Sequence, residues 1–246
     1  MATRIHGKDT QLYIDQYDFS GVALNATVTS NREVADVTAF ADTDMTYVFG
    51  KMGGTIDITG LWSAASPAWD SFLFSDLGTD GVNVSVWPEG AAAGKRGWAA
   101  ECTGTSHPFT ANTGDFISAD VSYQTESALV YARSYWQQTS GTTTNDNSNE
   151  YQDGAISSSQ IGVGFLQVFS AGGSSPTLDI KIQSDSAESM SSPTDRITFT
   201  RATGATVERK TVAGPVTDDW YRVTITAGGS SPAFTYIVAF GIVEAG

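Results

Sequence analysis

Residues Phe165-Leu-Gln-Val-Phe-Ser-Ala-Gly-Gly-Ser-Ser-Pro176-Thr-Leu-Asp-Ile-Lys-Ile182 set the fold of the second half of the chain, because their pattern returns at Tyr221-Arg-Val-Thr-Ile-Thr-Ala-Gly-Gly-Ser-Ser-Pro232-Ala-Phe-Thr-Tyr-Ile-Val238. In each copy an alternating apolar segment is followed by Ala-Gly-Gly-Ser-Ser-Pro and then by a second alternating segment. Alternation with a period of two is typical of strands with one buried face. Paired glycines permit the positive φ of a chain reversal, and proline suits an unpaired position at the start of a return strand. The repeat therefore predicts two similar β-hairpins.

Two further strand candidates, residues 196–200 and 206–212, lie between the two copies of the repeat. Together these segments predict a compact sandwich or barrel of about six strands over residues 151–246.

The first half of the chain also consists mainly of short alternating segments, for example 12–14, 22–28 and 82–87. Residues 66–77 have a different pattern, with apolar side chains at helical spacing, and we expect them to form one helix that packs on a sheet. The residues that indicate this helix are Ser66 as cap, Pro67 at the first turn, Trp69, Phe72, Leu73 and Leu77 on one face, and Gly78 at the end.

The stretch from Gln137 to Glu150 contains no apolar side chain, and such a segment cannot bury enough surface to fold independently. We expect it to be a polar linker between a first domain at 1–136 and a second at 151–246. The expected fold class is all-β with one short helix, in two sandwich-like or barrel-like domains.

Composition excludes several classes of protein. A net charge of -14, with 13 basic against 27 acidic residues, disfavours tight nucleic-acid binding, which needs clustered Lys and Arg. The single cysteine, Cys102, rules out a disulfide within the chain, and we expect it to be buried. Residues 1–7 lack the apolar segment of a secretion signal, and no apolar stretch approaches the about 20 residues of a membrane span. We therefore expect a soluble protein that is made in the cytoplasm.

Residues that could carry chemistry are few. His6 and His107 are the only histidines, and neither lies in a catalytic motif. Asp42 and Asp44 are the most suggestive carboxylate pair for a cation, but the rest of a calcium loop is missing, so a solvated loop is the favoured interpretation. The tryptophans alternate with apolar neighbours, which favours core packing over stacking on sugars. We expect no catalytic, cofactor-binding or metal-binding residues.

Several short motifs follow one another in the first half: Gly7 to Asp15, Asp18 to Gly21, Asp36 to Asp42, and Gly53 to Trp62 leading into the helix. In this order they resemble the major tail tube protein of long non-contractile-tailed bacteriophages. The second half resembles the C-terminal portion common in such proteins of phages that infect actinobacteria and other hosts. The residues that carry this second likeness are Phe165 to Phe169, Lys181 to Ser186, Phe199-Thr200, Trp220 to Val223 and Phe234 to Phe240.

The resemblance implies a structural virion protein of the phage tail, made in the host cytoplasm, without enzymatic activity, cofactor or membrane. Its copies would form homotrimeric or homohexameric rings that stack into a tube, with tape-measure and tail terminator proteins as partners. Viral DNA would pass through the lumen without specific binding. An insertion-like segment at 89–97 and a short second half depart from the pattern. They leave open whether the second half is a tube barrel or an appended domain.

The segment from Thr38 to Met52 places apolar side chains in a polar setting, and we expect it to contact the neighbouring ring. The candidate assembly residues are Phe40, Asp42, Asp44, Met45, Tyr47, Val48 and Phe49. Deletion of residues 42–49 would then stop tube formation while the monomer stays folded. Two alternatives remain open: a capsid decoration or other tail-associated protein, and, in another class, a carbohydrate-binding module that presents aromatic side chains on a sheet face.

Overall fold

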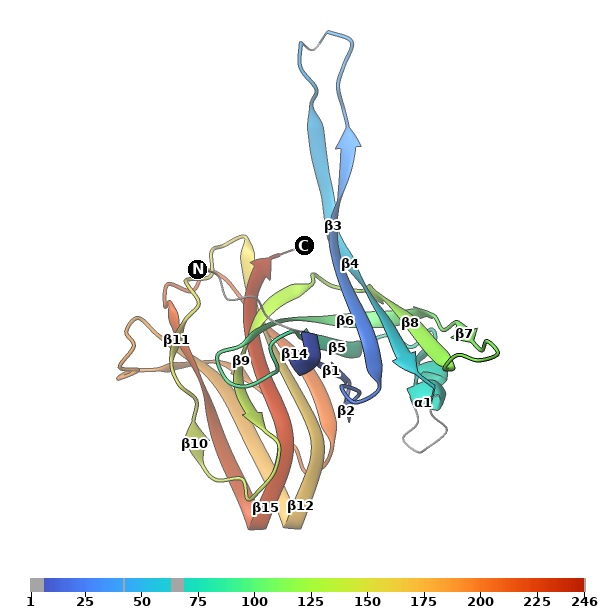
Figure 1. Ribbon diagram of the computed structural model, residues 1–246. Coiled ribbons are helices and arrows are strands. Elements are labelled where there is room, and N and C mark those ends of the chain that lie inside the picture. The colour runs from blue at the N-terminus through green and yellow to red at the C-terminus, as the bar shows by residue number, and fades with distance from the viewer. Residues whose placement is uncertain (1–6, 42, 63–68, 246) are drawn as a thin grey trace, which may run out of the picture. The chain divides into compact units, whose positions relative to one another are not determined.

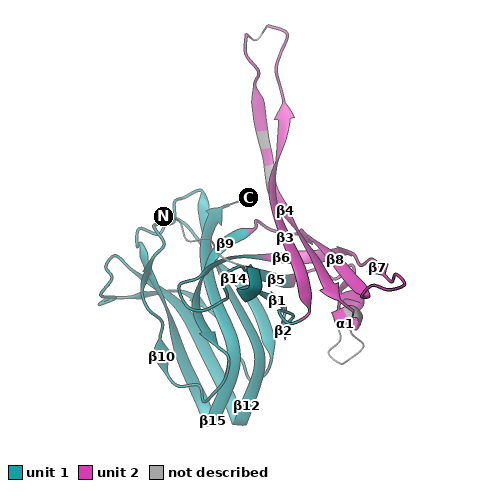
Figure 2. Ribbon diagram, in the orientation of Figure 1, with its two compact units in different colours: residues 1–21, 83–99, 130–245 teal, residues 22–82, 100–129, 246 magenta. Residues whose placement is uncertain are grey.

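The computed structural model describes residues 7–41, 43–62 and 69–245, and the chain divides into two compact units (Figures 1 and 2). Unit 1 comprises residues 1–21, 83–99 and 130–245, and unit 2 comprises residues 22–82, 100–129 and 246. Nearly all regular structure in the described residues is β-strand, so the expected all-β class is confirmed.

Unit 1 is built around two long antiparallel strands, β12 (Gln160–Asp185) and β15 (Trp220–Glu244). They pair with each other from Gln160↔Glu244 to Asp185↔Trp220. The other elements with residues in this unit are η1 (Gly7–Asp9), β1 (Gln11–Ile14), β2 (Tyr17–Asp18), β5 (Val82–Trp87), β6 (Arg96–Ser106), β9 (Val130–Gln138), β10 (Asp146–Asn147), β11 (Tyr151–Gln152), β13 (Thr194–Thr198) and β14 (Thr206–Ala213).

The two Ala-Gly-Gly-Ser-Ser-Pro segments do not close two hairpins, so that prediction is wrong. They lie opposite each other in the β12–β15 ladder, where the register shifts between Gly172 and Ser174 and again between Ser174 and Thr177. Positive φ occurs at Gly173 and at Gly229, as the glycine pairs predicted. The glycines bend a two-stranded ribbon instead of reversing one strand, because the hydrogen-bonding partner of each copy is the other copy.

The bend folds the ribbon onto itself and makes a β-sandwich, as expected for this part of the chain. The first half of β12 lies between β14 and β15, and its second half lies between β13 and β15. Side chains from both halves share one buried core: Leu166 and Val168 pack in the same cluster as Ile180, Val223 and Phe240. Burial of these apolar faces stabilises unit 1.

The polar stretch 137–150 lies along β15 rather than forming a free linker. Thr143 is buried, its backbone N–H donates to the Pro232 carbonyl at 2.7 Å, and its hydroxyl accepts from the Phe234 N–H at 2.9 Å. Farther along, β10 pairs with residues 224–225 of β15. Polar side chains can face water from an edge strand while their backbone bonds to the sheet, and composition alone does not reveal this placement.

The two units follow a different division from the predicted boundary at 137–150. Strands β1, β5 and β9 belong to the predicted first domain, but they lie in the sheet that contains β12 and β15. In particular, β9 pairs with residues 236–240 of β15. The sequence predicted β1 and β5 as strands, but it predicted neither β9 nor the long-range pairing of these strands.

Unit 2 contains a sheet in the order β3, β4, β8, β6, with β3 at Ala23–Asp36, β4 at Tyr47–Leu61, β8 at Ser118–Thr125 and residues 100–106 of β6. A short strand, β7 (Phe109–Thr110), pairs with the start of β8. One face of this sheet is covered by α1 (Trp69–Asp76).

The predicted helix at about 66–77 is confirmed over Trp69–Asp76, whereas Ser66 and Pro67 lie outside the described residues. Trp69 is buried and its indole N–H donates to the Ala119 carbonyl at 2.7 Å. A positive φ at Gly78 follows the helix, as predicted. Leu77 is exposed, contrary to expectation, because the helix ends one residue earlier and buries Asp76 on that side instead.

Candidate functional site

The most unusual feature of unit 2 is the hairpin formed by β3 and β4, which pair from Ala23↔Gly60 to Asp36↔Tyr47 (Figure 1). Only residues 55–61 of β4 also pair with β8. We call residues 30–52 the arm, because within the sheet of unit 2 these residues of β3 and β4 pair only with each other. A two-stranded hairpin is marginally stable in water by itself, so this segment is suited to gaining further contacts on assembly.

The arm carries apolar side chains that face solvent. Phe40, in the connection between the strands, has a relative exposure of 115%, and Met45 follows it at 71%. Val34, Tyr47 and Val48 are about half exposed. Several exposed apolar side chains gathered on one segment are typical of a protein–protein contact.

The tip of the arm is held by hydrogen bonds around Asp36. Its carboxylate accepts from the Thr38 N–H at 2.9 Å and from the Thr38 hydroxyl at 2.5 Å. The same hydroxyl accepts from the Thr46 N–H at 2.9 Å, and the Val37 N–H donates to the Thr46 carbonyl. The hydroxyl and N–H of Thr38 lower the pKa of Asp36 below its usual value. The Asp36 carboxylate therefore fixes Thr38, whose hydroxyl holds the other end of the connecting loop.

The structure brings the predicted assembly residues together on the arm. Phe40, Asp44 and Met45 lie in the connecting loop, while Tyr47 and Val48 begin β4. The Tyr47 hydroxyl contacts the Met45 sulfur at 3.0 Å, so these two side chains form one surface. Phe49 pairs with Val34 through its backbone, and Asp42 lies outside the described residues. The assembly role of this set remains a prediction.

A second group of exposed apolar side chains lies at the opposite end of β4, and the sequence analysis did not identify it. It consists of Leu61, Trp62, Phe109, Phe116 and Ile117, which are all exposed, and we call it the end patch. The sequence does contain a signal for it, because apolar residues stand alone in the polar segment 105–118. The same kind of pattern identified the arm.

Backbone pairing holds the end patch together. Leu61 pairs with Ser118, and the Trp62 N–H donates to the Ile117 carbonyl at 3.0 Å. Phe109 pairs with Ala119 from the other side of β8. Three segments of unit 2 therefore place these side chains at one end of the sheet.

A buried carboxylate in unit 1, that of Asp153, is bonded to three protein side chains. Asp153 has 3% side-chain exposure and forms ion pairs with Arg96 and with Arg133, the latter at 2.9 Å. The Tyr135 hydroxyl also donates to it at 2.6 Å, and burial raises the pKa of that tyrosine well above its usual value. This network attaches the segment before β12 to the strands β6 and β9, which is a structural role.

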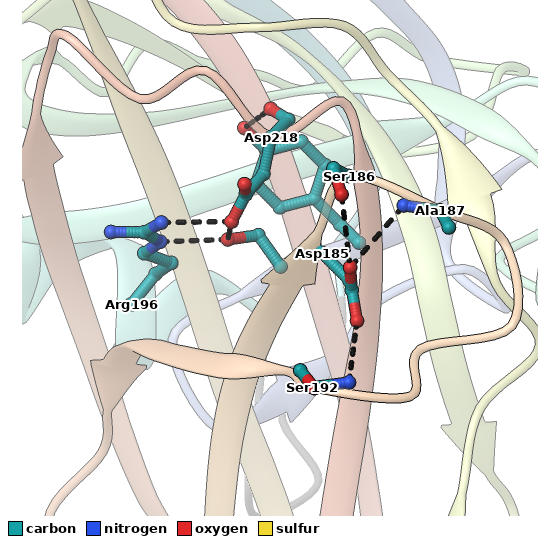
Figure 3. Close-up of polar contacts among 8 residues, drawn as sticks. Asp185, Ser186, Ala187, Ser192, Arg196 and Asp218 are labelled. Carbon is teal, nitrogen blue, oxygen red and sulfur yellow. Dashed lines mark hydrogen bonds and ion pairs between the residues drawn. The ribbon is translucent and has the colours of Figure 1, made fainter.

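A second acidic group lies where β12 ends, and Figure 3 shows its contacts. The Asp185 carboxylate accepts from the Ser192 N–H at 2.8 Å and from the Ala187 N–H at 3.3 Å. The Ser192 N–H is the main cause of the lowered pKa of Asp185. These bonds close the loop between β12 and β13.

Asp218 beside it is bonded to Arg196 at 2.8 Å and to the Ser184 hydroxyl at 2.7 Å (Figure 3). The Arg196 guanidinium lowers the pKa of Asp218. The Asp185 carboxylate therefore fixes its own loop, whereas the Asp218 carboxylate attaches the segment between β14 and β15 to β12 and β13, and both roles are structural.

The remaining candidate residues do not form a site. His107 bonds through Nδ1 to the Asp120 carbonyl at 2.6 Å, and His6 lies outside the described residues. Within residues 7–41, 43–62 and 69–245, no group of three or more His, Cys, Asp or Glu side chains is arranged to hold a metal ion. Cys102 is buried, as predicted.

None of the helices in the described part of the chain has the length and apolar character needed to cross a membrane.

Comparisons with known proteins give only low similarity. No protein-family model matches the sequence, and no curated protein matches it either. Solved structures that resemble the chain include one from the virion of a native gene transfer agent particle, with 17% identity and a TM-score of 0.41, covering 51% of this chain and 97% of that chain. The anti-feeding prophage cap, a tube-terminating cap, has 6% identity and a TM-score of 0.41, covering 52% and 91%.

The Dit protein of SPP1, from the hub adsorption apparatus of phages that infect Gram-positive hosts, matches over more of the chain. It covers 95% of this chain and 99% of that chain, at 10% identity and a TM-score of 0.36. At these identities and TM-scores the likenesses carry no functional inference.

Proposed function

We propose that the chain is a structural subunit of a bacteriophage tail, specifically a tail tube subunit that self-assembles into stacked rings forming a conduit for DNA. The observation that carries the proposal is the arm. Its strands pair only with each other within the sheet of unit 2, and its apolar residues, led by Phe40 and Met45, face solvent. The order of motifs in the first half, which resembles tail tube proteins, supports the same role.

The strand edges of unit 2 suit a subunit that joins its neighbours. β3 pairs only with β4 among the described strands, so its other edge has backbone groups that can accept a further strand. Exposed edges promote uncontrolled association unless a defined partner covers them. Closure of a ring would pair these edges with those of neighbouring copies and so prevent uncontrolled association.

Charge is compatible with a conduit for DNA. The chain carries a net charge of -14. Repulsion between like charges would keep DNA from adhering to the wall of the tube.

Electron microscopy of the purified full-length chain tests the proposal. A tube subunit forms regular rings or tubes, and mass measurement of one ring distinguishes three copies from six. Monomers or compact trimers at every concentration would contradict the proposal and favour a capsid decoration protein.

A further inference from the structure

We infer that the end patch receives the arm of a second copy of this chain, so that copies associate head to tail. This inference rests on the proposed function and specifies the contact that stacks one ring on the next. The arm of one copy supplies the apolar tip around Phe40 and Met45. The end patch of the next copy supplies Trp62, Phe109 and Ile117.

The first argument is the placement of the two surfaces within unit 2. β4 begins at Tyr47, beside the arm tip, and ends at Leu61, in the end patch. Its 15 residues span about 45–50 Å at the usual rise of an extended strand. Two different surfaces at opposite ends of one strand make a heterologous contact, which repeats as an open stack unless the rotation between successive copies closes a ring.

The second argument is charge. Asp36 and Asp44 flank the arm tip, and neither Lys nor Arg occurs between residues 33 and 50. Contact between two arm tips would therefore bring carboxylates of the same sign together, which is unfavourable. The five residues of the end patch are uncharged, and Asp115, which precedes Phe116, is the one acidic residue in the segment 109–118 that supplies three of them. An arm tip consequently fits the end patch better than it fits another arm tip.

The third argument is area. The five side chains of the end patch are between 36% and 56% exposed. A large aromatic side chain offers about 150–250 Å², so the end patch presents about 400 Å² of apolar surface. A stable interface buries about 800 Å² on each partner. One arm in one end patch is therefore a weak contact, and a ring that repeats it several times gains strength through multivalency.

Cross-linking between two engineered cysteines tests the contact directly. The protein suits this test because its only cysteine, Cys102, has 0% exposure. The full-length Phe40→Cys/Phe109→Cys double variant is treated with a short bis-maleimide. The matched control is Phe40→Cys/Tyr131→Cys, because Tyr131 is 53% exposed, as Phe109 is, but lies in unit 1.

Head-to-tail contact predicts a ladder of covalent oligomers for the Phe109 pair and at least about tenfold fewer for the control. Mixing the two single variants, Phe40→Cys and Phe109→Cys, should then stop the ladder at dimers. A Phe109 pair that cross-links no better than the control overturns the inference.

Electron micrographs of the wild-type chain separate this result from the proposed function. Tubes without the cross-link would keep the tube role and exclude the end patch as receiver. A ladder without rings or tubes would keep the head-to-tail contact and exclude the tube role.

Discussion

Substitution of Gly173 by alanine should destabilise unit 1, because the bend of the β12–β15 ribbon depends on that position. Gly173 has a φ of 101°, a conformation that L side chains rarely adopt. A Cβ added there would lie 2.5 Å from the Ser231 carbonyl oxygen and 2.8 Å from that of Ser230. Gly229 faces the backbone of residues 174–175 in the same way, so each hexapeptide leaves no room for a side chain at the glycine of the other.

The expected loss follows from these two effects. A non-glycine residue at such a φ costs about 1–3 kcal/mol. Overpacking against a rigid backbone costs about 1–3 kcal/mol more. Because partial relaxation reduces both, we expect Gly173→Ala to lower the free energy of unfolding of unit 1 by about 2–5 kcal/mol.

The assay is urea unfolding of the full-length chain followed by circular dichroism, with Gly172→Ala as the matched control. Gly172 lies in the same hexapeptide, but a Cβ there would only touch Ala233 at ordinary distances of 3.6–3.7 Å. The control should change the free energy by less than about 0.5 kcal/mol. Equal unfolding midpoints for the two variants would refute the claim that the bend requires glycine at position 173.

Three further predictions concern the other contacts. Asp153→Asn should cost about 2–3 kcal/mol, measured by the same unfolding assay, because it removes the buried carboxylate that balances two partly buried guanidinium groups; Glu89→Gln, at the exposed pair with Lys95, should have little effect. Gly60→Ala should lower the melting temperature of unit 2, because the new Cβ would meet the Trp69 indole nitrogen at 2.5 Å; an unchanged melting temperature would contradict the packing of α1. The pKa of Asp185 is lower in the folded state than in the unfolded state. The ionised carboxylate therefore stabilises the fold above about pH 4, and this stabilisation is lost as the pH falls through the folded pKa. In an acid titration, the free energy of unfolding of Asp185→Asn should consequently depend less steeply on pH than that of the wild type.

Local patterns in the sequence predicted local structure well. Alternation predicted β1, β5 and β14, and helical spacing with a terminal glycine predicted α1. The burial of Cys102 also followed from its residue type. These features depend on neighbours within a few residues, which the sequence displays directly.

Pairings between distant segments were not predictable from local patterns. The repeated hexapeptide has the glycines of a reversal, but its hydrogen-bonding partner is the other copy, more than fifty residues away. The same limit applies to the end patch, because three separate segments bring Trp62, Phe109 and Ile117 together only in the folded chain. By contrast, the arm was predictable in part, since its apolar residues lie within one short segment of the sequence.

The most direct test of the central claim, that the arm drives assembly, is electron microscopy of the wild-type chain beside a Phe40→Ser/Met45→Ser variant. Both side chains are exposed, so the variant should unfold at the same urea concentration as the wild type. The account predicts tubes for the wild type, and only separate rings or monomers for the variant at the same concentration. Tubes of equal length and number from the variant would contradict it.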